Sequence, residues 1–398
     1  MATGPGETGL RFHVASPEDL RGGRVTDVYF LRGKAALEAT GENPEVAAEV
    51  RAASLPGGWS WAVFAGLEEA LALLCDRHVT VEAMPEGSVF RAEDPVLTVT
   101  GRYLEFGVLE TALLGVVCQA SGVATRAARC AIAAEGTPLY SFGARRMHPA
   151  IAPMIERAAY LGGCDGVAAV ASAELLGLEP VGTMAHALIV ILGEERAWRT
   201  FDEVTDPKVP RVALVDTFRD ERFGAVAAAD TLREKLAAVR LDTPSSRRGD
   251  FKAILREVRW ELDARGFDEV RIFVSGGLDE DEIRDLVGHA DAFGVGTSIS
   301  SGPVVDFSLD IVEVEGEPRS KRGKLSGRKQ PWRCEQCGRH GIARRDAPVS
   351  LCPQCGSEVV TRTETWLDGG SLIRDLPTPG DVRALALREI ASAENPFG

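Results

Sequence analysis

Between residues 138 and 296 the chain alternates seven times between a short, mostly apolar run and a longer amphipathic one. The short runs have the length of buried strands, and the longer ones carry apolar residues at helical spacing. Strands and helices that alternate in this way form parallel sheets with the helices packed outside. Seven such units favour a parallel α/β barrel, with an open doubly wound sheet as the second choice. The predicted strands cover residues 139–142, 164–167, 180–183, 212–216, 239–242, 270–274 and 292–296.

Polar residues and glycines stand at the ends of these predicted strands. In a parallel barrel the carboxyl ends of all strands face one side of the molecule, and that side carries the active site. Glycines there let backbone N–H groups approach an anion closely, and barrels commonly hold phosphate after the last two strands. We therefore predict one site built from Arg145, Asp165, His186, Asp216, Asp242, Ser275, Gly276, Gly277, Gly294, Gly296 and Thr297.

A pair of arginines follows the first predicted strand. Residues 141–146 read Ser-Phe-Gly-Ala-Arg-Arg, and the apolar spacing after them predicts a helix over 145–160. Unpaired N–H groups at a helix start and two guanidinium groups favour a carboxylate or a phosphate. Phe142 adds a flat aromatic face. The segment predicts a place for a small aromatic acid and a phosphorylated substrate, although an arginine pair alone also occurs as a solvated helix end.

The residues before this region predict a different layer. Residues 1–10 are expected to form a flexible tail and 11–135 an N-terminal α+β sandwich, to which strands from 303–318 return. Residues 136–302 then form the barrel domain. Alternation over 24–30 predicts a strand with one solvent-facing side that carries Asp27 and Tyr29.

The most apolar stretch of the chain is residues 107–123. It is predicted to be a core helix and not a membrane span, because it is interrupted by Glu110, Thr111, Gln119 and Ser121. The first residues have no basic region followed by an apolar one, so we expect no signal peptide. These features predict a cytoplasmic protein without a membrane partner.

Four cysteines near the C-terminus form two pairs with the spacing of a zinc site. Each pair has two residues between its cysteines, and each is followed by a glycine, as a tight knuckle turn requires. Four thiolates close a tetrahedral coordination sphere, so the predicted zinc is structural. Two disulfides are the alternative, which a cytoplasmic setting disfavours. A small zinc-knuckle domain is predicted over 325–398, with the ligands Cys334, Cys337, Cys352 and Cys355.

Basic residues surround these cysteines and leave a different class of function open. A zinc ribbon with a basic patch can bind nucleic acid. The formal net charge of −14 disfavours non-specific binding to nucleic acid, so this alternative stays remote. The basic residues are Arg319, Lys321, Arg322, Lys324, Arg328, Lys329, Arg339, Arg344 and Arg345.

Taken in order, the motifs of the chain resemble the nicotinate phosphoribosyltransferases, within the nicotinate, quinolinate and nicotinamide phosphoribosyltransferase superfamily. The resemblance runs from residue 27 to about residue 301, and the cysteines resemble an extra C-terminal knuckle domain of one branch. The motifs that carry it are Thr26-Asp27-Val28-Tyr29, Ser141-Phe142-Gly143-Ala144-Arg145-Arg146, Gly182-Thr183-Met184-Ala185-His186, Val215-Asp216-Thr217-Phe218, Arg240-Leu241-Asp242-Thr243, Ser275-Gly276-Gly277-Leu278 and Gly294-Val295-Gly296-Thr297.

This resemblance implies an enzyme of NAD biosynthesis, a ligase-type pentosyl transfer coupled to ATP hydrolysis. Nicotinate and phosphoribosyl diphosphate would give nicotinate mononucleotide and diphosphate, with Mg²⁺ as the ion. It also implies an α/β sandwich next to an incomplete parallel α/β barrel of about seven strands. The assembly would be a homodimer, or a larger assembly of dimers, whose active sites are shared between subunits. The partners would be small molecules and a second copy of the chain, with no nucleic acid.

The resemblance also implies roles for individual residues. Phe142 would stack on the pyridine ring, and Tyr29 of a partner subunit would cover its other face. Arg145 would hold the diphosphate or the carboxylate of the base, and Arg240 would lie near the ribose phosphate. Asp216 and Asp242 would lie near magnesium. The further substrate-binding residues would be Asp27, Ser141, Arg146, Asp165, Thr183, Ser275, Gly276, Gly277, Gly294, Gly296 and Thr297.

His186 is the predicted site of a transient phosphate. In the resembling family the matching histidine is phosphorylated by ATP. Asp216 ends the next predicted strand and is expected to accept a hydrogen bond from one ring nitrogen, which leaves the other as a nucleophile. A histidine beside an apolar helix is otherwise often an ordinary core residue.

One departure from the family pattern affects the choice of base. Many relatives follow the Arg-x-Asp motif with Ser-Gly, whereas this chain has Thr-Pro-Ser-Ser at 243–246. The motifs determine the base substituent less firmly than the phosphoribosyl transfer. Quinolinate phosphoribosyltransferase, which also releases carbon dioxide, is therefore kept as the nearest alternative.

Overall fold

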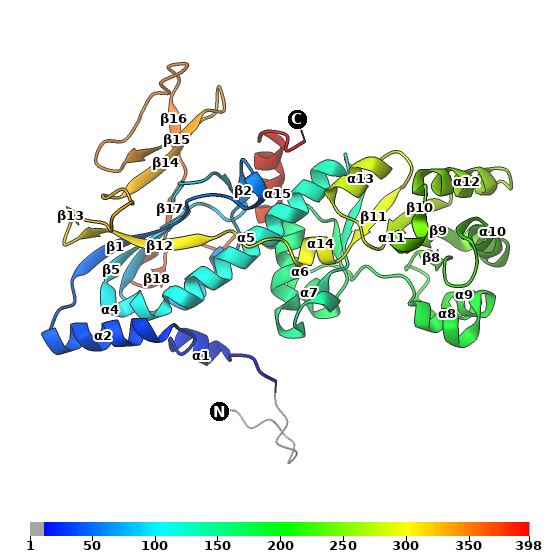
Figure 1. Ribbon diagram of the computed structural model, residues 1–398, viewed down its shortest axis with the longest axis horizontal. Coiled ribbons are helices and arrows are strands. Elements are labelled where there is room, and N and C mark those ends of the chain that lie inside the picture. The colour runs from blue at the N-terminus through cyan, green and yellow to red at the C-terminus, as the bar shows by residue number, and fades with distance from the viewer. Residues whose placement is uncertain (1–11, 398) are drawn as a thin grey trace, which may run out of the picture.

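The computed structural model describes residues 12–397, so the expected tail at 1–10 and the predicted first residue of the sandwich, 11, lie outside it. Two large sheets lie toward opposite ends of the molecule, and helix α5 (Glu110–Ala133) runs between them (Figure 1). One sheet is antiparallel and has seven strands, and the other is parallel and has six. A three-stranded sheet carries the cysteines.

The seven-stranded sheet has the strand order β13-β12-β1-β5-β3-β17-β18. The alternating segment near 306–315 forms β12 and pairs with β1, with Leu309 opposite Val50. On β3, Val79, Val81 and Ala83 are buried while the residues between them are half exposed, which is the pattern of a sheet with one packed face. The strands are β1 (Glu45–Ala52), β3 (Val79–Ala83), β5 (Leu97–Arg102), β12 (Phe307–Val314), β13 (Glu317–Pro318), β17 (Glu364–Asp368) and β18 (Ser371–Leu372).

Shorter elements complete this end of the molecule. A separate two-stranded pair, β2 with β4, packs nearby. The elements are α1 (Pro17–Arg21), α2 (Val28–Thr40), β2 (Ala62–Val63), α3 (Leu67–Leu74), β4 (Val89–Phe90) and α4 (Tyr103–Phe106).

The strand predicted for residues 24–30 is wrong, because this segment leads into helix α2. Asp27 stands at the N-cap position with extended backbone, and the helix ends at Gly41 in the left-handed conformation with φ 72°. The alternation covered too few residues to distinguish a strand from the first turn of a helix. None of the α2 residues is buried within this chain.

The parallel sheet has the order β7-β6-β11-β10-β9-β8, so its first strand, β6, pairs with its last, β11. This pairing curls the sheet into a half-barrel of six strands, which confirms an incomplete parallel barrel. The strands are β6 (Leu139–Ser141), β7 (Gly166–Val167), β8 (Arg211–Leu214), β9 (Leu236–Leu241), β10 (Arg271–Ser275) and β11 (Ala292–Val295). The helices around it are α6 (Ala152–Leu161), α7 (Val170–Leu176), α8 (His186–Leu192), α9 (Glu194–Val204), α10 (Glu221–Leu232), α12 (Phe251–Asp263), α13 (Glu280–Leu286) and α14 (Thr297–Ser300).

One of the seven predicted strands, the one over 180–183, is wrong. The N–H of Val181 donates to the carbonyl of Val167 at 2.8 Å, so the segment runs beside β7. Pro180 has no N–H to give, and the described segment forms no ladder. The half-barrel is therefore open between this segment and β8.

Helix α5 belongs to the cores of both sheets. Leu113 and Val117, in its first half, pack in the core of the antiparallel sheet, and Val123 and Ala127, further along, pack in the core of the half-barrel. The segment Tyr103–Ala133 is long and apolar enough to cross a membrane, but 56% of its most apolar window is buried inside the protein. This placement agrees with the predicted core helix.

The segment expected as one zinc-knuckle domain, 325–398, is divided between three places. Strand β14 (Lys329–Cys334) pairs with β15 (His340–Arg344) and β16 (Val359–Thr361) around the cysteines. Strand β17 then joins the antiparallel sheet beside β3. The last helix, α15 (Pro379–Ala391), packs against α6 of the half-barrel.

Candidate active site

A cavity of about 580 Å³ opens at the carboxyl ends of the half-barrel strands. It brings together most residues that the sequence placed at these strand ends, from segments that lie between Phe142 and Ser298. Guanidinium groups, two aspartates, hydroxyls and glycine backbone line it. The lining residues are Phe142, Arg145, Arg146, Ala168, Val181, Gly182, Thr183, Arg240, Asp242, Ser275, Gly276, Gly277, Leu278, Asp279, Gly294, Gly296, Thr297 and Ser298.

Asp242 is held in one orientation by residues of two adjacent strands. The Ser275 hydroxyl donates to Asp242 Oδ1 at 2.6 Å and accepts from Arg240 Nε at 2.8 Å. A guanidinium nitrogen of Arg240 lies 3.3 Å from the same Asp242 oxygen, and another donates to the Thr183 hydroxyl at 3.0 Å. Burial raises the pKa of Asp242, but the charge of Arg240 and the Ser275 hydrogen bond bring it below its ordinary value. Asp242 is therefore ionised at neutral pH.

Glycine is required beside this carboxylate. Gly276 has φ 85°, which disfavours a side chain, and a Cβ there would lie 2.8 Å from the Asp242 carbonyl oxygen. The loop after β10 can approach the end of β9 this closely only without a side chain.

His186 is the first residue of α8 and contacts Asp242. Its Nε2 lies 3.3 Å from Asp242 Oδ2, and its Nδ1 lies 3.0 Å from the Thr217 hydroxyl. An ionised carboxylate can only accept, so in the neutral imidazole this contact places the proton on Nε2, and the lone pair on Nδ1 accepts from the Thr217 hydroxyl.

The predicted contact between His186 and Asp216 is wrong. Asp216 Oδ2 instead accepts from the backbone N–H of Asp242 at 2.8 Å. Asp216 follows β8, and its carboxylate reaches sideways to the end of β9, whereas Asp242 reaches the histidine. Burial raises the pKa of Asp216, and its Oδ1 is buried without a hydrogen-bond partner among the described residues.

The arginine pair does not lie in a long helix, so the helix predicted over 145–160 is wrong in its first part. Residues Ala144–Arg146 form a short 3₁₀ turn, another covers Pro149–Ile151, and the helix α6 begins only at Ala152. The proline at 149 disfavours helical backbone in the residue before it. Arg145 and Arg146 are exposed at the cavity wall, and neither forms an ion pair with another residue in the described range.

Phe142 offers an aromatic face to the cavity. The Arg240 guanidinium carbon lies 5.3 Å from its ring centroid, and the Phe273 ring lies 5.7 Å away. A Cβ on Gly294 would lie 2.6 Å from the Phe142 ring, so only glycine leaves room for the ring. A flat ligand stacked here would lie within reach of three arginines.

Several predicted site residues lie elsewhere. Asp165 precedes β7 and does not follow it, so it lies at the other end of the strand, where it accepts from the Leu139 N–H at 2.9 Å and pairs with Arg383 at 2.8 Å. Its predicted place in the substrate site is therefore wrong for this chain. Ser141 is fully buried at the end of β6 and does not line the cavity.

Asp27 and Tyr29 also lie away from this cavity. Asp27 Oδ2 accepts from the Thr111 hydroxyl at 3.0 Å, and Tyr29 is 59% exposed on α2. Helix α2 lies beside the antiparallel sheet, at the end of the molecule away from the half-barrel (Figure 1).

Sequence reasoning missed some residues of this site. Thr217 and Thr243 stand inside the recognised motifs, but their hydroxyl contacts follow from the fold alone. Asp279 lines the cavity and also caps α13, where the Asp-x-x-Glu pattern of a capping box was a readable signal.

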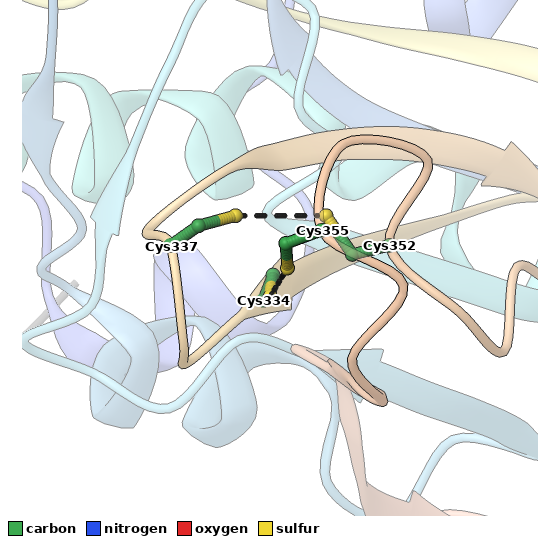
Figure 2. Close-up of side chains that lie close together, drawn as sticks. All are labelled: Cys334, Cys337, Cys352 and Cys355. Atoms are coloured by element: carbon green, nitrogen blue, oxygen red, sulfur yellow. Dashed lines mark hydrogen bonds between the residues drawn. The ribbon is translucent and has the colours of Figure 1, made fainter.

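The four cysteines form one cluster that could hold a metal such as zinc. Their sulfur atoms all lie within 4.8 Å of one another (Figure 2). Cys334 and Cys355 have sulfurs 3.5 Å apart, and those of Cys337 and Cys352 are 3.6 Å apart. These distances are too long for a disulfide and close to the ~3.8 Å edge of a tetrahedron with ~2.3 Å zinc–sulfur bonds.

The two cysteine pairs are held by the same backbone pattern. Gly338 and Gly356 donate to the carbonyls of Cys334 and Cys352, both at 2.9 Å, with φ 71° and 74°. These are the tight turns that the glycine after each pair predicted.

Three of the basic residues before the cysteines are paired with buried acids. Lys329 Nζ lies 2.9 Å from fully buried Glu49, and Lys321 and Lys324 lie 2.6 and 2.9 Å from Asp310. Burial raises the pKa of Asp310, but hydrogen bonds from both lysines outweigh it and bring the pKa to about 2. The basic segment therefore packs against the antiparallel sheet, and acidic residues of the same chain neutralise much of its positive charge.

Comparison with known proteins identifies the family of this chain. Family models of quinolinate phosphoribosyl transferase match it, the N-terminal domain over residues 27–121 and the C-terminal domain over residues 123–310. A nicotinate phosphoribosyltransferase of Mycobacterium tuberculosis is 33% identical over 356 residues, which cover 78% of each chain. A nicotinate phosphoribosyltransferase of Bacillus subtilis is 29% identical over 245 residues, covering 58% of this chain and 49% of that protein.

Two solved structures extend the similarity to the fold. A nicotinate-nucleotide pyrophosphorylase from Pyrococcus furiosus is 52% identical, with a TM-score of 0.94 over 96% of this chain and 98% of that one. Human nicotinic acid phosphoribosyltransferase is 21% identical, with a TM-score of 0.74 over 93% and 94% of the two chains, and shares the fold. The chain therefore belongs to the family of phosphoribosyltransferases that includes the quinolinate and nicotinate enzymes.

Proposed function

We propose that this protein is a nicotinate phosphoribosyltransferase, which joins nicotinate to the ribose of phosphoribosyl diphosphate in NAD biosynthesis in the cytoplasm. The observation that carries the proposal is the strand-end cavity, where an aromatic face, unpaired arginines and glycine-rich loops meet. The names of the relatives in Mycobacterium tuberculosis and Bacillus subtilis support nicotinate as the base.

The reaction exchanges one bond at the ribose C1 carbon. The pyridine nitrogen forms a bond to C1 as the bond from C1 to the diphosphate oxygen breaks, and the diphosphate leaves with the electron pair. Positive charge develops on the sugar and negative charge on the leaving group. Guanidinium groups and backbone N–H groups already aimed at the leaving group stabilise that charge without reorganising.

We assign the residues of the cavity to the parts of these substrates. The nicotinate ring stacks on Phe142, and Arg145 and Arg146 meet its carboxylate or the diphosphate. Arg240 lies beside the ring and next to Asp242, where it can hold the ribose phosphate. The glycine-rich loops after β10 and β11 offer backbone N–H groups to phosphate oxygens.

The acidic residues of the site fit a magnesium ion. Asp216 Oδ1 is buried and has no hydrogen-bond partner among the described residues, whereas Asp216 Oδ2 accepts from the backbone N–H of Asp242. Carboxylate oxygens are the ligands that Mg²⁺ prefers, and a bound Mg²⁺ would neutralise charge on the diphosphate. Asp216 and Asp242 are the residues that would hold it.

The nearest alternative is a decarboxylating quinolinate phosphoribosyltransferase, which the family models name. Quinolinate carries two carboxylates, and its reaction releases one as carbon dioxide. His186 at the edge of the site, with a directed lone pair, favours an ATP-using enzyme. Assays with carboxyl-labelled quinolinate and ring-labelled nicotinate separate the two. Release of labelled carbon dioxide from quinolinate, together with no product from nicotinate, would contradict our proposal and identify the quinolinate enzyme.

Replacing Arg145 by alanine should lower kcat/KM for phosphoribosyl transfer by about 10²-fold, in line with the loss of one charge-stabilising contact. Arg145 is exposed and unpaired within the described chain, so the folded protein should keep its melting temperature. Arg199→Ala, on the outer helix α9 with a 62% exposed side chain, is the control and should stay within about twofold of the wild type. Equal activity of both variants would contradict the role of Arg145.

We also propose that two subunits share each active site. Helix α2 buries none of its residues within its own chain, although Val28, Tyr29 and Leu31 are apolar and exposed. A surface of this kind on a helix is typical of an interface. Tyr29 would then cover the open face of nicotinate in the partner's cavity.

Shared sites predict complementation between two inactive proteins. Tyr29→Ala and Arg145→Ala each damage a different half of the site, so a mixed dimer contains one site with both residues intact. Mixing equal amounts of the two inactive variants should restore about a quarter of wild-type activity once chains exchange, because half of the dimers are mixed and each mixed dimer has one intact site of two. Mass spectrometry of differently labelled chains checks the exchange. Confirmed exchange with no regained activity would contradict sharing.

A further inference from the structure

The loop after β9 departs from the family pattern and contains a buried arginine that the proposed function does not use. Residues 243–246 read Thr-Pro-Ser-Ser, and Pro244 is the N-cap residue of the short helix α11 (Ser245–Arg248). Arg248 ends this helix and is only 7% exposed. Burial lowers the pKa of its guanidinium group, and no carboxylate of the described residues lies within salt-bridge distance of it. A buried charge without such a partner costs folding free energy, which only its other contacts can offset.

The guanidinium group of Arg248 joins the ends of two strands. Its Nε donates to the Thr243 carbonyl at 2.7 Å, and one terminal nitrogen donates to the Ser275 carbonyl at 3.3 Å. The last paired residues of these strands are Leu241 and Val274, so Arg248 bridges the strands just beyond their ladder. Its guanidinium carbon lies 4.9 Å from the Phe251 ring centroid.

The two bridged residues flank the carboxylate of the active site. Thr243 follows Asp242 directly, and the Ser275 hydroxyl donates to Asp242 Oδ1 at 2.6 Å. The other Asp242 oxygen meets His186 at 3.3 Å. On the far side, the Thr243 hydroxyl donates to Glu221 Oε1 at 2.7 Å. A change in the separation of the two strand ends would therefore move Asp242 relative to both Ser275 and His186.

We propose that Arg248 is a positioning residue, which holds the ends of β9 and β10 together and so keeps Asp242 aligned with Ser275 and His186. Arg248 does not line the substrate cavity, so it acts through the two carbonyls. The inference rests on the proposed function, because kcat for nicotinate is its readout. A displacement of about 1 Å in a catalytic constellation can lower turnover by about 10²-fold.

A second cavity beside Arg248 permits a sharp test. This cavity of about 630 Å³ is lined by two basic residues, Arg248 and Lys252, and by a larger number of acidic ones, so it attracts small cations. The acidic residues are Asp250, Asp279, Asp281, Glu282 and Asp285. In Arg248→Ala, added guanidinium ion can enter through it and occupy the space left by the side chain.

The experiment compares Arg248→Ala and Arg248→Lys with the control Arg247→Ala. Arg247 is the neighbouring residue, and its side chain is exposed. We expect kcat of Arg248→Ala to fall about 10²-fold while KM for nicotinate changes less than threefold, and Arg247→Ala to stay within twofold. Guanidinium chloride at millimolar, non-denaturing concentrations should raise kcat of Arg248→Ala at least tenfold, and sodium chloride should not. Lysine reaches one carbonyl at a time, so Arg248→Lys should lose about tenfold.

The outcomes separate this inference from the function on which it rests. An inactive wild type would overturn the proposed function. An active wild type with unchanged kcat in a folded Arg248→Ala, or a loss that guanidinium does not reverse, would overturn the role of Arg248. Should Arg248→Ala fail to fold, Arg248→Lys decides, and wild-type kcat in that variant would overturn the inference.

Discussion

His186→Ala should lose ATP hydrolysis and all stimulation of the transfer reaction by ATP, while a slow, ATP-independent transfer persists. In the proposed step the ring nitrogen that does not face Asp242 attacks the γ-phosphorus of ATP. The nitrogen–phosphorus bond forms as the bond from the γ-phosphorus to the bridging oxygen breaks, and ADP leaves. Water later cleaves the phosphohistidine and releases phosphate. Alanine removes the nucleophile but leaves the cavity that binds the other substrates.

The label from γ-labelled ATP tests this assignment directly. Phosphohistidine is acid-labile and base-stable, so wild-type protein should carry such a label and His186→Ala should carry none. His78→Ala, which removes an exposed histidine of the first domain, is the matched control and should label like the wild type. Label that persists in His186→Ala would refute the assignment, as would equal stimulation of both proteins by ATP.

We propose that the cysteine cluster holds zinc, so removal of one exposed cysteine should release the metal and destabilise the sheet β14–β16. Structural zinc in small domains contributes an apparent ~10–16 kcal/mol of binding free energy, far above the ~0.5–3 kcal/mol of an ordinary substitution. Cys337→Ser should therefore contain less than one zinc per chain by elemental analysis and melt at a lower temperature. Cys75→Ser, outside the cluster, should keep both values.

The location of the cluster predicts what its loss leaves intact. The sheet is also anchored by the buried pair of Lys329 and Glu49 and by Arg362, which lies 2.7 Å from Glu389 of α15. The strand-end cavity contains none of the cysteines. The choice between nicotinate and quinolinate should therefore be unchanged in any folded, metal-free protein. A metal-free Cys337→Ser protein that melts like the wild type would contradict a structural role.

The half-barrel and most of the cavity could be predicted because they are built from a repeated strand–helix unit. Six parallel strands present their ends on one side, so residues such as Arg240, Asp242 and Ser275 fall together once alternation is recognised. The cysteine cluster could also be predicted, because its geometry follows from the local spacing within each of the two cysteine pairs.

Features set by single turns or by side-chain direction could not be read in this way. Asp165 was assigned to the wrong end of a two-residue strand, and Tyr29 to a strand in place of a helix. The identity of the residue that contacts His186 depends on which of two aspartates points across the strands. Arg248 contacts carbonyls 5 and 27 residues away, a relation that no local pattern records.

The strand order of the antiparallel sheet has a consequence for how the chain is made. Its three middle strands, β1, β5 and β3, are synthesised first, and the strands that flank them on both sides come from beyond residue 306. The whole half-barrel must therefore leave the ribosome before either edge is covered. During that interval both edges expose unpaired backbone groups that can pair with other chains. The nascent protein is thus most prone to aggregation late in translation, when its catalytic half can already be folded.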